Sequence, residues 1–366
     1  MPLDIDAVSR PSRVAEPDEG ISAEELQLAA RNHGLPLEAL RFDITPPGLH
    51  YLLTHYDIAM VDPAGFRVLV DGLVDTALSL DLDDLRSRPR ESRVVTMECA
   101  GNGRARLSPR PVSQPWLVEA VGTSRWTGTP LAPLLREAGV HDGAVEVVFT
   151  GADHGIERGV EQDYQRSLPV AEAMGEDILL AYEMNGAPLP PQHGYPLRLV
   201  VPGWYGMAHV KWLARIEVVA EPFDGYQMRA YRTRQQPDEP GVSLTRIEPR
   251  ALLVPPGFPD FMSRARVLRA GRTTVEGRAW SGWAPVDGVE VSIDGGDTWD
   301  SATLEPAPDR WGWARWTWTW EATAGSYVLS VRASDRSGRS QPTDQPWNRG
   351  GFANNLVQRV PVAVVG

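Results

Sequence analysis

The sequence is poor in cysteine and in basic residues, and it has no long apolar run. Its single cysteine, Cys99, excludes a disulfide framework, zinc sites that need two or more thiolates, and the haem-attachment motif. Lys and Arg number 36 against 48 Asp and Glu, and the formal net charge of -12 makes nucleic acid a poor partner. No apolar run approaches the ~18 residues needed to span a membrane. Residues 1–20 lack the apolar core of a signal peptide, so we expect a cytoplasmic protein.

The remaining composition is that of a globular protein with two domains. The chain has 366 residues, of which 42% are hydrophobic and 23% are charged, and this length exceeds one ordinary core. We predict a loose acidic N-terminal extension over residues 1–45 and an α+β domain over 46–235. A connector rich in proline and arginine follows over 236–262, and an all-β domain over 263–366 completes the chain.

The α+β class of the first domain follows from its mixture of strands and short helices. Apolar and alternating runs predict strands, whereas runs with helical spacing and caps predict helices. Since strands and helices do not alternate regularly, the pattern argues against a βαβ sheet. We predict strands at 66–70, 93–99, 146–151, 178–182 and 197–202, and helices at 23–32, 80–85 (capped by Ser79) and 130–138 (ending at Gly139).

Beyond residue 263 the pattern changes to short strands separated by turns. Trp316, Trp318 and Trp320 alternate with threonines, so one face of a strand there is aromatic. We expect that face to pack inside the domain. About a hundred residues of short strands without a disulfide predict an immunoglobulin-like β-sandwich that is held by packing alone.

Cys99 closes a predicted strand and is followed by the glycine-rich turn 100–103. The backbone N–H groups of the turn and the nearby Arg104 favour a thiolate. That suits a nucleophile or a soft-metal ligand, while a lone cysteine is also commonly an inert core residue. These interpretations stay open on spacing alone. Arg106 stands where a dinucleotide-binding loop needs its third glycine, which argues against that loop.

Several motifs occur in the order in which the sulfite oxidase family has them. Residues 96–104 (TMECAGNGR) resemble its molybdenum-domain signature, and the likeness continues through 115–116, 125–128, 179–190, 193–203 and 209–213. Residues 294–299 (DGGDTW) and 345–348 (QPWN) are similar to the dimerisation domain of that family. The resemblance runs from roughly Tyr51 to the end of the chain.

The resemblance implies a molybdenum–molybdopterin cofactor and makes Cys99 the single protein ligand of the molybdenum. A thiolate suits this role because a soft, charged donor stabilises a high-valent metal. Arg198 lies in an apolar strand, where an unpaired guanidinium is costly, so a cofactor phosphate accounts for it. By position, the resemblance implies six cofactor contacts: His55, Asp153, His193, Arg198, His209 and Lys211.

The resemblance also implies a substrate pocket for a small anion or an S=O compound. Its members here are Arg104, Trp116 and Tyr231, with Arg349 near the C-terminus. Two positions depart from the family pattern. Leu53 stands where the family has an arginine, and Gly350 stands at a second arginine position, one residue after Arg349. We therefore expect a less positive pocket, with weak ground-state binding of sulfite and a high KM.

We expect, from this resemblance, a molybdenum-dependent oxidoreductase of the sulfite oxidase type. It would oxidise sulfite or a related sulfur compound by two-electron oxygen-atom transfer. No haem or flavin domain is recognisable, so we expect a separate electron acceptor such as a cytochrome c-like carrier. We also expect a homodimer through the C-terminal domain. Three alternatives stay open: a sulfoxide-type oxygen-atom reductase on the same fold, a Cys-dependent hydrolase with a binding sandwich, and a catalytically silent scaffold.

Overall fold

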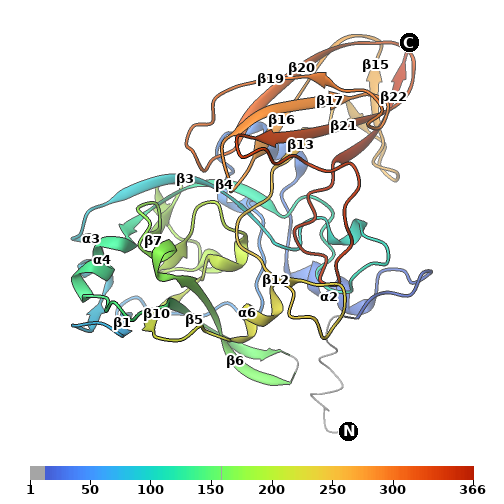
Figure 1. Cartoon of the computed structure of the whole chain (residues 1–366). Coiled ribbons are helices and arrows are strands. Elements are labelled where there is room, and N and C mark those ends of the chain that lie inside the picture. The colour runs from blue at the N-terminus through green and yellow to red at the C-terminus, as the bar shows by residue number, and fades with distance from the viewer. Residues whose placement is uncertain (1–12, 158) are drawn as a thin grey trace.

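The computed structural model describes residues 13–157 and 159–366. It has a larger domain with sheets and short helices and a smaller all-β domain that packs on it (Figure 1). The first twelve residues of the predicted N-terminal extension, part of the stretch searched for a signal peptide, lie outside the described residues. No helix in the described part of the chain combines the length and the apolarity needed to cross a membrane.

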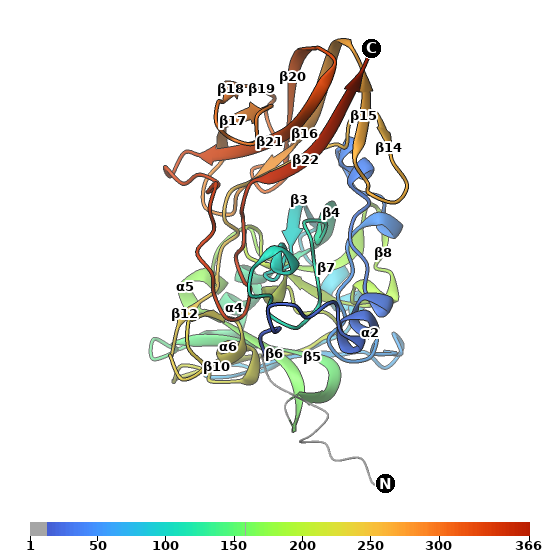
Figure 2. The ribbon, with the colours of Figure 1, turned by 90° about the vertical axis from the view of Figure 1, so that its right-hand side faces the viewer.

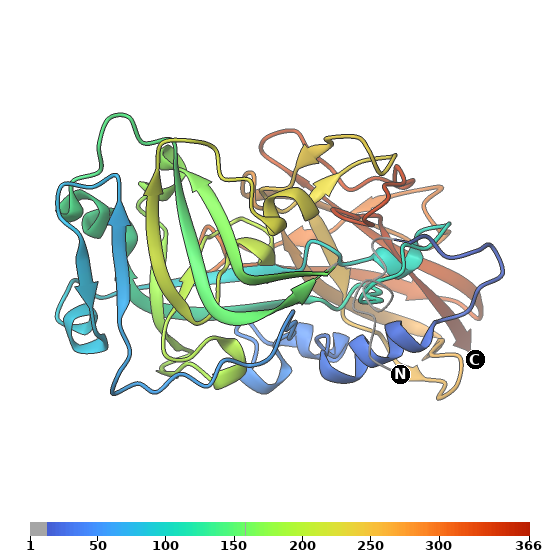
Figure 3. The same cartoon turned by 90° about the horizontal axis from the view of Figure 1, so that it is seen from below.

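One sheet of the larger domain has the strand order β2-β1-β10-β5-β6. β1 (Val68–Gly72) pairs in parallel with β10 (Leu213–Val219) and antiparallel with β2 (Leu78–Leu80). β5 (Glu146–Glu157) and β6 (Val160–Pro169) form a long hairpin that curves beneath the domain (Figure 3). The register of this hairpin shifts between Thr150 and His154, so the sheet is irregular where Asp153 lies.

The second sheet of this domain is antiparallel and carries Cys99 at the end of its first strand. β3 (Glu91–Glu98) pairs with β4 (Val121–Pro130), and β4 pairs with β7 (Leu179–Met184). β8 (Ala187–Pro188) and β9 (Arg198–Val200) both pair with β7. The strands predicted from alternation are all present, with ends that differ by a few residues.

Few helices accompany these sheets, and their caps explain where they begin and end. α3 begins after Asp81, whose carboxylate accepts the N–H groups of Asp83 and Asp84, so the cap is two residues later than the predicted Ser79, which lies in β2. α4 ends at Gly139, as predicted, and this glycine takes the left-handed conformation with φ 72°. The α-helices of the described residues are α2 (Ala23–Arg31), α3 (Leu82–Arg86), α4 (Leu131–Ala138), α5 (Val170–Ala173) and α6 (Tyr226–Ala230).

The smaller domain consists of two sheets that enclose one apolar core. Trp316 and Trp320 are buried between them and Trp318 is partly buried, so the aromatic face does pack inside the domain. One sheet has β13 (Arg250–Leu253), β16 (Gly271–Trp280), β20 (Ala314–Ala322) and β19 (Thr303–Leu304). The other has β14 (Phe258–Pro259), β15 (Arg266–Arg269), β22 (Gln358–Val365), β21 (Gly325–Asp335), β17 (Val286–Ser292) and β18 (Asp300–Ser301).

Two predicted boundaries differ from the structure. β13 lies inside the predicted connector but is fully buried and pairs with β16, so the sheets of the smaller domain begin before residue 263. A short ribbon of β11 (Arg232–Thr233) and β12 (Val242–Ser243) spans the predicted boundary at residue 235, so regular structure continues into the first part of the connector. The reason is that the apolar side chains of β13 gain free energy by leaving water, although the residues around them are rich in proline and arginine.

The described part of the N-terminal extension is also packed rather than loose. Leu35 and Leu40 are buried in one cluster with Trp280 and Trp313 of the smaller domain. Arg278 of β16 donates to the carbonyl oxygen of Leu40 at 2.8 Å. Figure 2 shows this N-terminal segment, in blue, running from α2 up to the C-terminal sheets. The segment therefore helps to fix the two domains relative to one another.

Candidate active site

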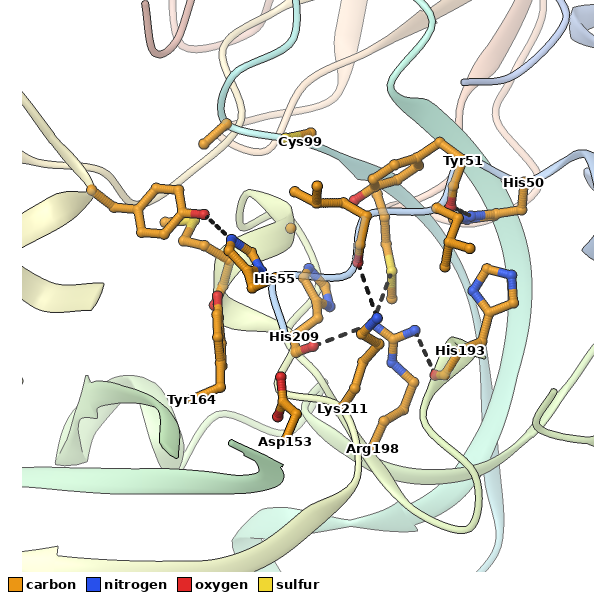
Figure 4. A pocket seen from close by; sticks show the side chains of 17 residues that line it. His50, Tyr51, His55, Cys99, Asp153, Tyr164, His193, Arg198, His209 and Lys211 are labelled. Carbon is orange, nitrogen blue, oxygen red and sulfur yellow. Dashed lines mark hydrogen bonds between the residues drawn. The ribbon is translucent and has the colours of Figure 1, made fainter. Parts of the chain in front are cut away.

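A cavity lies in the larger domain beside the end of β3 (Figure 4). The space between its lining side chains, counted together with the solvent at its mouth, is about 640 Å³. Side chains from both sheets and from the loops between them reach it. The lining residues are His50, Tyr51, Leu52, Leu53, His55, Met97, Cys99, Ala100, Asp153, Tyr164, His193, Arg198, Gly206, Met207, His209, Lys211 and Tyr231.

Cys99 lies at one wall of the cavity and is buried. Burial raises the pKa of its thiol, whereas the charge of Arg104, the N–H of Gly101 and the side chain of Trp116 favour the thiolate. No group of three or more His, Cys, Asp or Glu side chains in residues 13–157 and 159–366 is arranged to hold a metal ion. A metal bound to Cys99 would therefore take most of its ligands from a non-protein group.

Two cations, one buried and one partly buried, lie at the far end of the cavity. Arg198, at the start of β9, donates to the carbonyl oxygens of His193 and His209 at 3.0 and 3.2 Å. Its guanidinium lies 4.6 Å from the ring centre of Trp126, and its Nε has no hydrogen-bond partner among the described residues. Burial lowers the pKa of Arg198 to about 10. An arginine in this setting lacks the anion that would balance it.

Lys211 is the second of these cations. Its Nζ donates to the carbonyl oxygens of Leu53 and Gln192 at 3.0 and 3.1 Å. Burial, and then the charge of Arg198, lower the pKa of Lys211 to about 7. No carboxylate in the part of the chain that the structure describes is in ion-pair contact with either cation, and the one carboxylate whose charge acts on Lys211 is that of Asp153. A phosphate at this end would offset both charges.

Asp153 is the acidic residue nearest to this end of the cavity. It lies in β5 at the irregular stretch of the hairpin and is buried. Its Oδ1 has no partner among the described residues. Burial raises the pKa of Asp153 to about 6, and the charge of Lys211 opposes that rise. A carboxyl group with this pKa can donate a hydrogen bond to a polar ring system when it is protonated and accept one when it is ionised.

Four histidines line the same cavity, and burial is the first cause of the lowered pKa of each. The pKa is about 4 for His50 and His55, about 2 for His193 and about 3 for His209. All four are therefore neutral at pH 7 and can donate and accept hydrogen bonds. His50 Nε2 has no partner among the described residues.

His209 differs from the other three because both of its ring nitrogens are already used. Its Nδ1 accepts the N–H of Val201 at 3.1 Å, and its Nε2 donates to the carbonyl oxygen of Trp204 at 3.1 Å. Its own carbonyl oxygen accepts from Arg198. His209 thus holds Arg198 in place through its backbone, while its ring fixes the loop that ends in η5 (Gly206–Ala208).

The end of the cavity nearer to Cys99 is aromatic. His55 Nε2 and the Tyr231 hydroxyl are 2.6 Å apart, and the ring of Tyr164 lies 5.0 Å from that of His55 (Figure 4). Burial raises the pKa of Tyr231 and of Tyr164 well above the usual value for tyrosine. Both hydroxyl groups therefore stay protonated and can donate a hydrogen bond.

Arg104 lies behind the Cys99 turn rather than in the lining. Its Nε donates to the carbonyl oxygen of Gly350 at 2.8 Å, and its guanidinium lies 5.1 Å from the ring centre of Phe352. Trp116 is buried close by, and its indole Nε1 reaches no oxygen acceptor among the described residues. Arg349 is outside the lining, and its backbone N–H donates to the carbonyl oxygen of Arg234 at 2.8 Å.

The structure thus brings together most of the residues singled out from the sequence. Eight of them line one cavity: Cys99, His55, Asp153, His193, Arg198, His209, Lys211 and Tyr231. Arg104 and Trp116 lie outside the lining but favour the thiolate of Cys99. Arg349 neither lines the cavity nor acts on that thiol. Leu53 lines the cavity, and a carbonyl oxygen, that of Gly350, faces Arg104.

Several lining residues were not predicted from the sequence. Met97 had a usable signal, because it lies two residues before Cys99 on the same face of β3. His50, Tyr51 and Tyr164 carried none. His50 and Tyr51 come from an irregular loop after η2 (Pro47–Leu49), and Tyr164 is one of several residues of β6 with no motif around it. Only the folded chain therefore places them at the cavity.

Comparison with known proteins identifies relatives for both domains. Residues 55–227 match the family model of the oxidoreductase molybdopterin binding domain, and residues 259–365 match that of the Mo-co oxidoreductase dimerisation domain. Sulfite oxidase of Gallus gallus is 36% identical over 356 residues, which cover 88% of this chain and 73% of that protein. Mitochondrial sulfite oxidase of Mus musculus is 35% identical over 342 residues.

The alignment with the mouse protein covers 88% of this chain but only 62% of the relative, so the chain spans less than two thirds of its length. Among solved structures, the sulfane dehydrogenase SoxCD from Paracoccus pantotrophus is similar with a TM-score of 0.78 and 25% sequence identity. That likeness covers 98% of this chain and 89% of the solved chain. The likeness to the solved structure therefore includes both domains of this chain over nearly their full length.

Proposed function

This chain belongs to the sulfite oxidase family of molybdopterin oxidoreductases, and from that premise we propose that it is a molybdenum-dependent oxidoreductase acting on a small sulfur compound. One observation carries the proposal. A single buried cysteine, a buried arginine and a partly buried lysine line the same cavity, and neither cation is in ion-pair contact with a carboxylate of the described residues. A cofactor that brings its own sulfur ligands and a phosphate needs this combination of a thiolate at one end and positive charge at the other.

The residues present fit the cofactor of this family. Three buried polar atoms of the lining have no partner among the described residues: His50 Nε2, Asp153 Oδ1 and Arg198 Nε. Buried polar atoms in folded proteins are nearly always hydrogen-bonded, so three in one cavity favour a polar ligand there. The neutral imidazoles add donors and acceptors without further charge.

The roles that we propose divide the cavity in two. The Cys99 thiolate would hold the molybdenum, and Arg198 and Lys211 would hold the phosphate. His55, His193 and Asp153 would bond to the ring system, while His209 would act through Arg198 and its own loop. When bound, the cofactor supplies a two-electron redox centre that is able to transfer an oxygen atom.

The substrate would bind at the aromatic end beside Cys99. Tyr231 keeps its proton and would donate a hydrogen bond to an oxygen of the substrate, with His55 orienting the hydroxyl at 2.6 Å. Arg104 would add positive charge from behind the turn, and Trp116 would exclude water. Since Leu53 contributes no charge to the lining, we propose sulfite or a less charged sulfur compound, such as the sulfane sulfur named for the SoxCD relative.

Arg349 has the weakest support as a substrate contact. Its side chain is outside the lining, and a carbonyl oxygen of the neighbouring Gly350 already holds Arg104. We therefore propose for Arg349 at most a long-range contribution to the positive potential of the site.

We also propose a homodimer and a separate electron acceptor such as a cytochrome c-like carrier. The match of residues 259–365 to a dimerisation domain supports the dimer, and two sheets around one core support an immunoglobulin-like sandwich. Light scattering of the full chain should return about twice its mass of 40.3 kDa. A mass near 40.3 kDa at micromolar concentration would contradict the dimer.

Molybdenum analysis tests the central proposal. The full chain, made in a host that produces molybdopterin, should carry close to one molybdenum per chain and oxidise a sulfur substrate. Cys99→Ser should lose oxidation by roughly 100-fold or more, because serine is a harder ligand than a thiolate. The same variant should keep its melting temperature, since only one small atom changes. Full metal-free activity, or activity of Cys99→Ser at the wild-type rate, would refute the assignment.

A further inference from the structure

A buried ion pair links the strand that carries Cys99 to the smaller domain. Glu98 is the last residue of β3, and Arg250 is the first residue of β13. Arg250 Nε lies 2.8 Å from Glu98 Oε1, and the two side chains are only 2% and 1% exposed. The contact is a close ion pair without the alignment of an ideal hydrogen bond, since Nε has no partner that meets hydrogen-bond geometry.

The carboxylate of Glu98 has two further donors. Trp280 Nε1 of the smaller domain donates to Oε2 at 2.8 Å, and Asn102 Nδ2 donates to Oε1 at 3.0 Å. Asn102 lies within the turn that follows Cys99, and its own Oδ1 accepts the N–H of Ala120. Glu98 therefore ties the start of the Cys99 turn, the turn itself and the second domain to one another.

Arg250 reaches the other end of the same turn through Asn354. Its Nη2 donates to the carbonyl oxygen of Asn354, whose Nδ2 in turn donates to the carbonyl oxygen of Gly103 at 2.7 Å. Gly103 has φ 91°, and a Cβ there would lie 2.9 Å from Asn354 atoms. Between these two points, Ala353 donates its N–H to the carbonyl oxygen of Ala100 at 2.9 Å.

From this arrangement we infer that Arg250 is a positioning residue for the cofactor site: through Glu98 and Asn354 it holds both ends of the Cys99 turn, so that the smaller domain sets the place of the metal ligand. The inference rests on the proposed role of Cys99 as that ligand. It gives the second domain a part in the cofactor site that is separate from dimerisation. No side chain of Arg250 or Glu98 lines the cavity, so their effect on Cys99 is indirect.

Stability alone does not account for such a pair. Removing two charges from water costs about as much as their attraction returns, and apolar pairs of similar volume are often equally stable. What a charged pair adds is direction, because its geometry specifies where each partner must lie. At the residue next to Cys99, a fixed direction is what a metal ligand needs.

The test uses the reactivity of the Cys99 thiol, which is the only thiol of the chain. The full-length protein is prepared without cofactor, and its alkylation by iodoacetamide is timed at a temperature well below unfolding. Arg250→Met leaves a buried carboxylate unpaired and frees both ends of the turn, so we expect alkylation to become about tenfold faster. Glu98→Gln/Arg250→Met removes both charges and should return the rate to within about threefold of wild type.

A milder variant guards against a failure of Arg250→Met to fold. Asn354→Ala removes the side-chain bond to Gly103 and leaves its carbonyl oxygen for Arg250, so it should raise the alkylation rate about threefold. The matched control is Arg278→Met. Arg278 is similarly buried and also links the smaller domain to another segment, since it donates to the carbonyl oxygen of Leu40 and pairs with Asp43 of the N-terminal segment. It does not contact the Cys99 turn.

Arg278→Met should lower the melting temperature without changing the alkylation rate. The inference is overturned if Arg250→Met and Asn354→Ala both leave that rate within a factor of two, or if Arg278→Met raises it equally. A chain that proves unable to bind molybdenum would refute the proposed function, yet the alkylation rates would still decide whether Arg250 fixes the turn. In the loaded protein, the same order of variants should appear in the rate at which molybdenum is lost to a chelator.

Discussion

The cavity beside Cys99 and the core of the smaller domain are both buried, but they are made of opposite kinds of side chain. The core around Trp316 and Trp320 is apolar, and the sheets on either side satisfy their own backbone. The cavity instead collects Arg198, Lys211 and four neutral histidines. In the core the buried polar atoms without hydrogen-bond partners are neutral, Trp316 Nε1 and Ser330 Oγ. Guanidinium atoms without such a partner differ between the two regions: Arg250 Nε of the smaller domain lies against a carboxylate, whereas Arg198 Nε in the cavity does not.

The difference shows which region folds for its own stability and which is arranged for a ligand. Apolar burial stabilises the smaller domain directly. The cavity costs free energy in the absence of a ligand, because buried charges without counter-ions lose their hydration. The apolar clusters around it supply the stability that holds these groups in place.

The largest expected effect tests this contrast by substitution in each region. In the cofactor-free chain, Trp316→Ala should lower the free energy of unfolding by about 3–5 kcal/mol, because it leaves a cavity in a packed core. Arg198→Met should change it by no more than about 1 kcal/mol, or raise it, because removing an unbalanced buried charge offsets the loss of its two hydrogen bonds to carbonyl oxygens. Urea denaturation of each variant measures both values.

The matched control for Arg198 lies in the smaller domain. Arg266 is similarly buried, but its Nε and Nη2 both donate to carbonyl oxygens of residues 255–257, whereas the Nε of Arg198 has no partner among the described residues and only its two Nη atoms bond to carbonyl oxygens. Arg266→Met should therefore cost about 1.5–3 kcal/mol. If Arg198→Met costs as much as Trp316→Ala, the cavity contributes to stability like an ordinary core and the contrast fails.

A smaller effect concerns pH. In the unfolded chain a histidine has a pKa of about 6.5, whereas the folded pKa is about 4 for His50 and about 3 for His209. The unfolded state therefore binds more protons below pH 6.5, and the folded state loses stability as the pH falls. Between pH 7 and pH 5 each such histidine should cost the cofactor-free chain about 2 kcal/mol.

Thermal unfolding at pH 7 and pH 5 measures this loss, and His50→Gln should reduce it by about 2 kcal/mol. His154 is the control, because it is exposed and Asp163 and Glu161 raise its pKa. A raised pKa contributes stability at low pH that is lost as the pH rises, so His154→Gln should not reduce the acid loss. An equal loss in wild type and His50→Gln would place the acid sensitivity elsewhere.

The smallest effect concerns the substrate end of the cavity, where the lining gains no charge from Leu53. Leu53→Arg should lower the KM for sulfite by about tenfold, because one charge-assisted contact is worth about 1.5–3 kcal/mol. Leu53→Met keeps the volume without the charge and should leave the KM unchanged. Steady-state kinetics of the three proteins measure this, and a micromolar KM in the wild-type protein would show that another cation already fills the role.

Much of the fold could be predicted from local pattern. Alternation in β3, β5 and β20 and the cap at Gly139 are properties of short segments, and they appear as expected. The burial of β13 and of Leu35 and Leu40 could not be predicted, because nothing in the sequence near them specifies the distant strands and tryptophans that cover them. For this reason the sequence predicted less regular structure and less burial in the connector and the N-terminal extension than the folded chain has.

The candidate site divides in the same way. Cys99, Arg198 and Lys211 stand in motifs whose order along the chain already points to the sulfite oxidase family. Sequence by itself thus determined the family, the cysteine proposed as the ligand and the presence of most strands, because each depends on residues that are close along the chain. Only the tertiary structure decided that His50 faces the cavity, that Arg349 does not, and that Arg250 pairs with Glu98 beside Cys99. Residues 98, 250 and 354 are far apart along the chain, and their contact depends on how both domains pack.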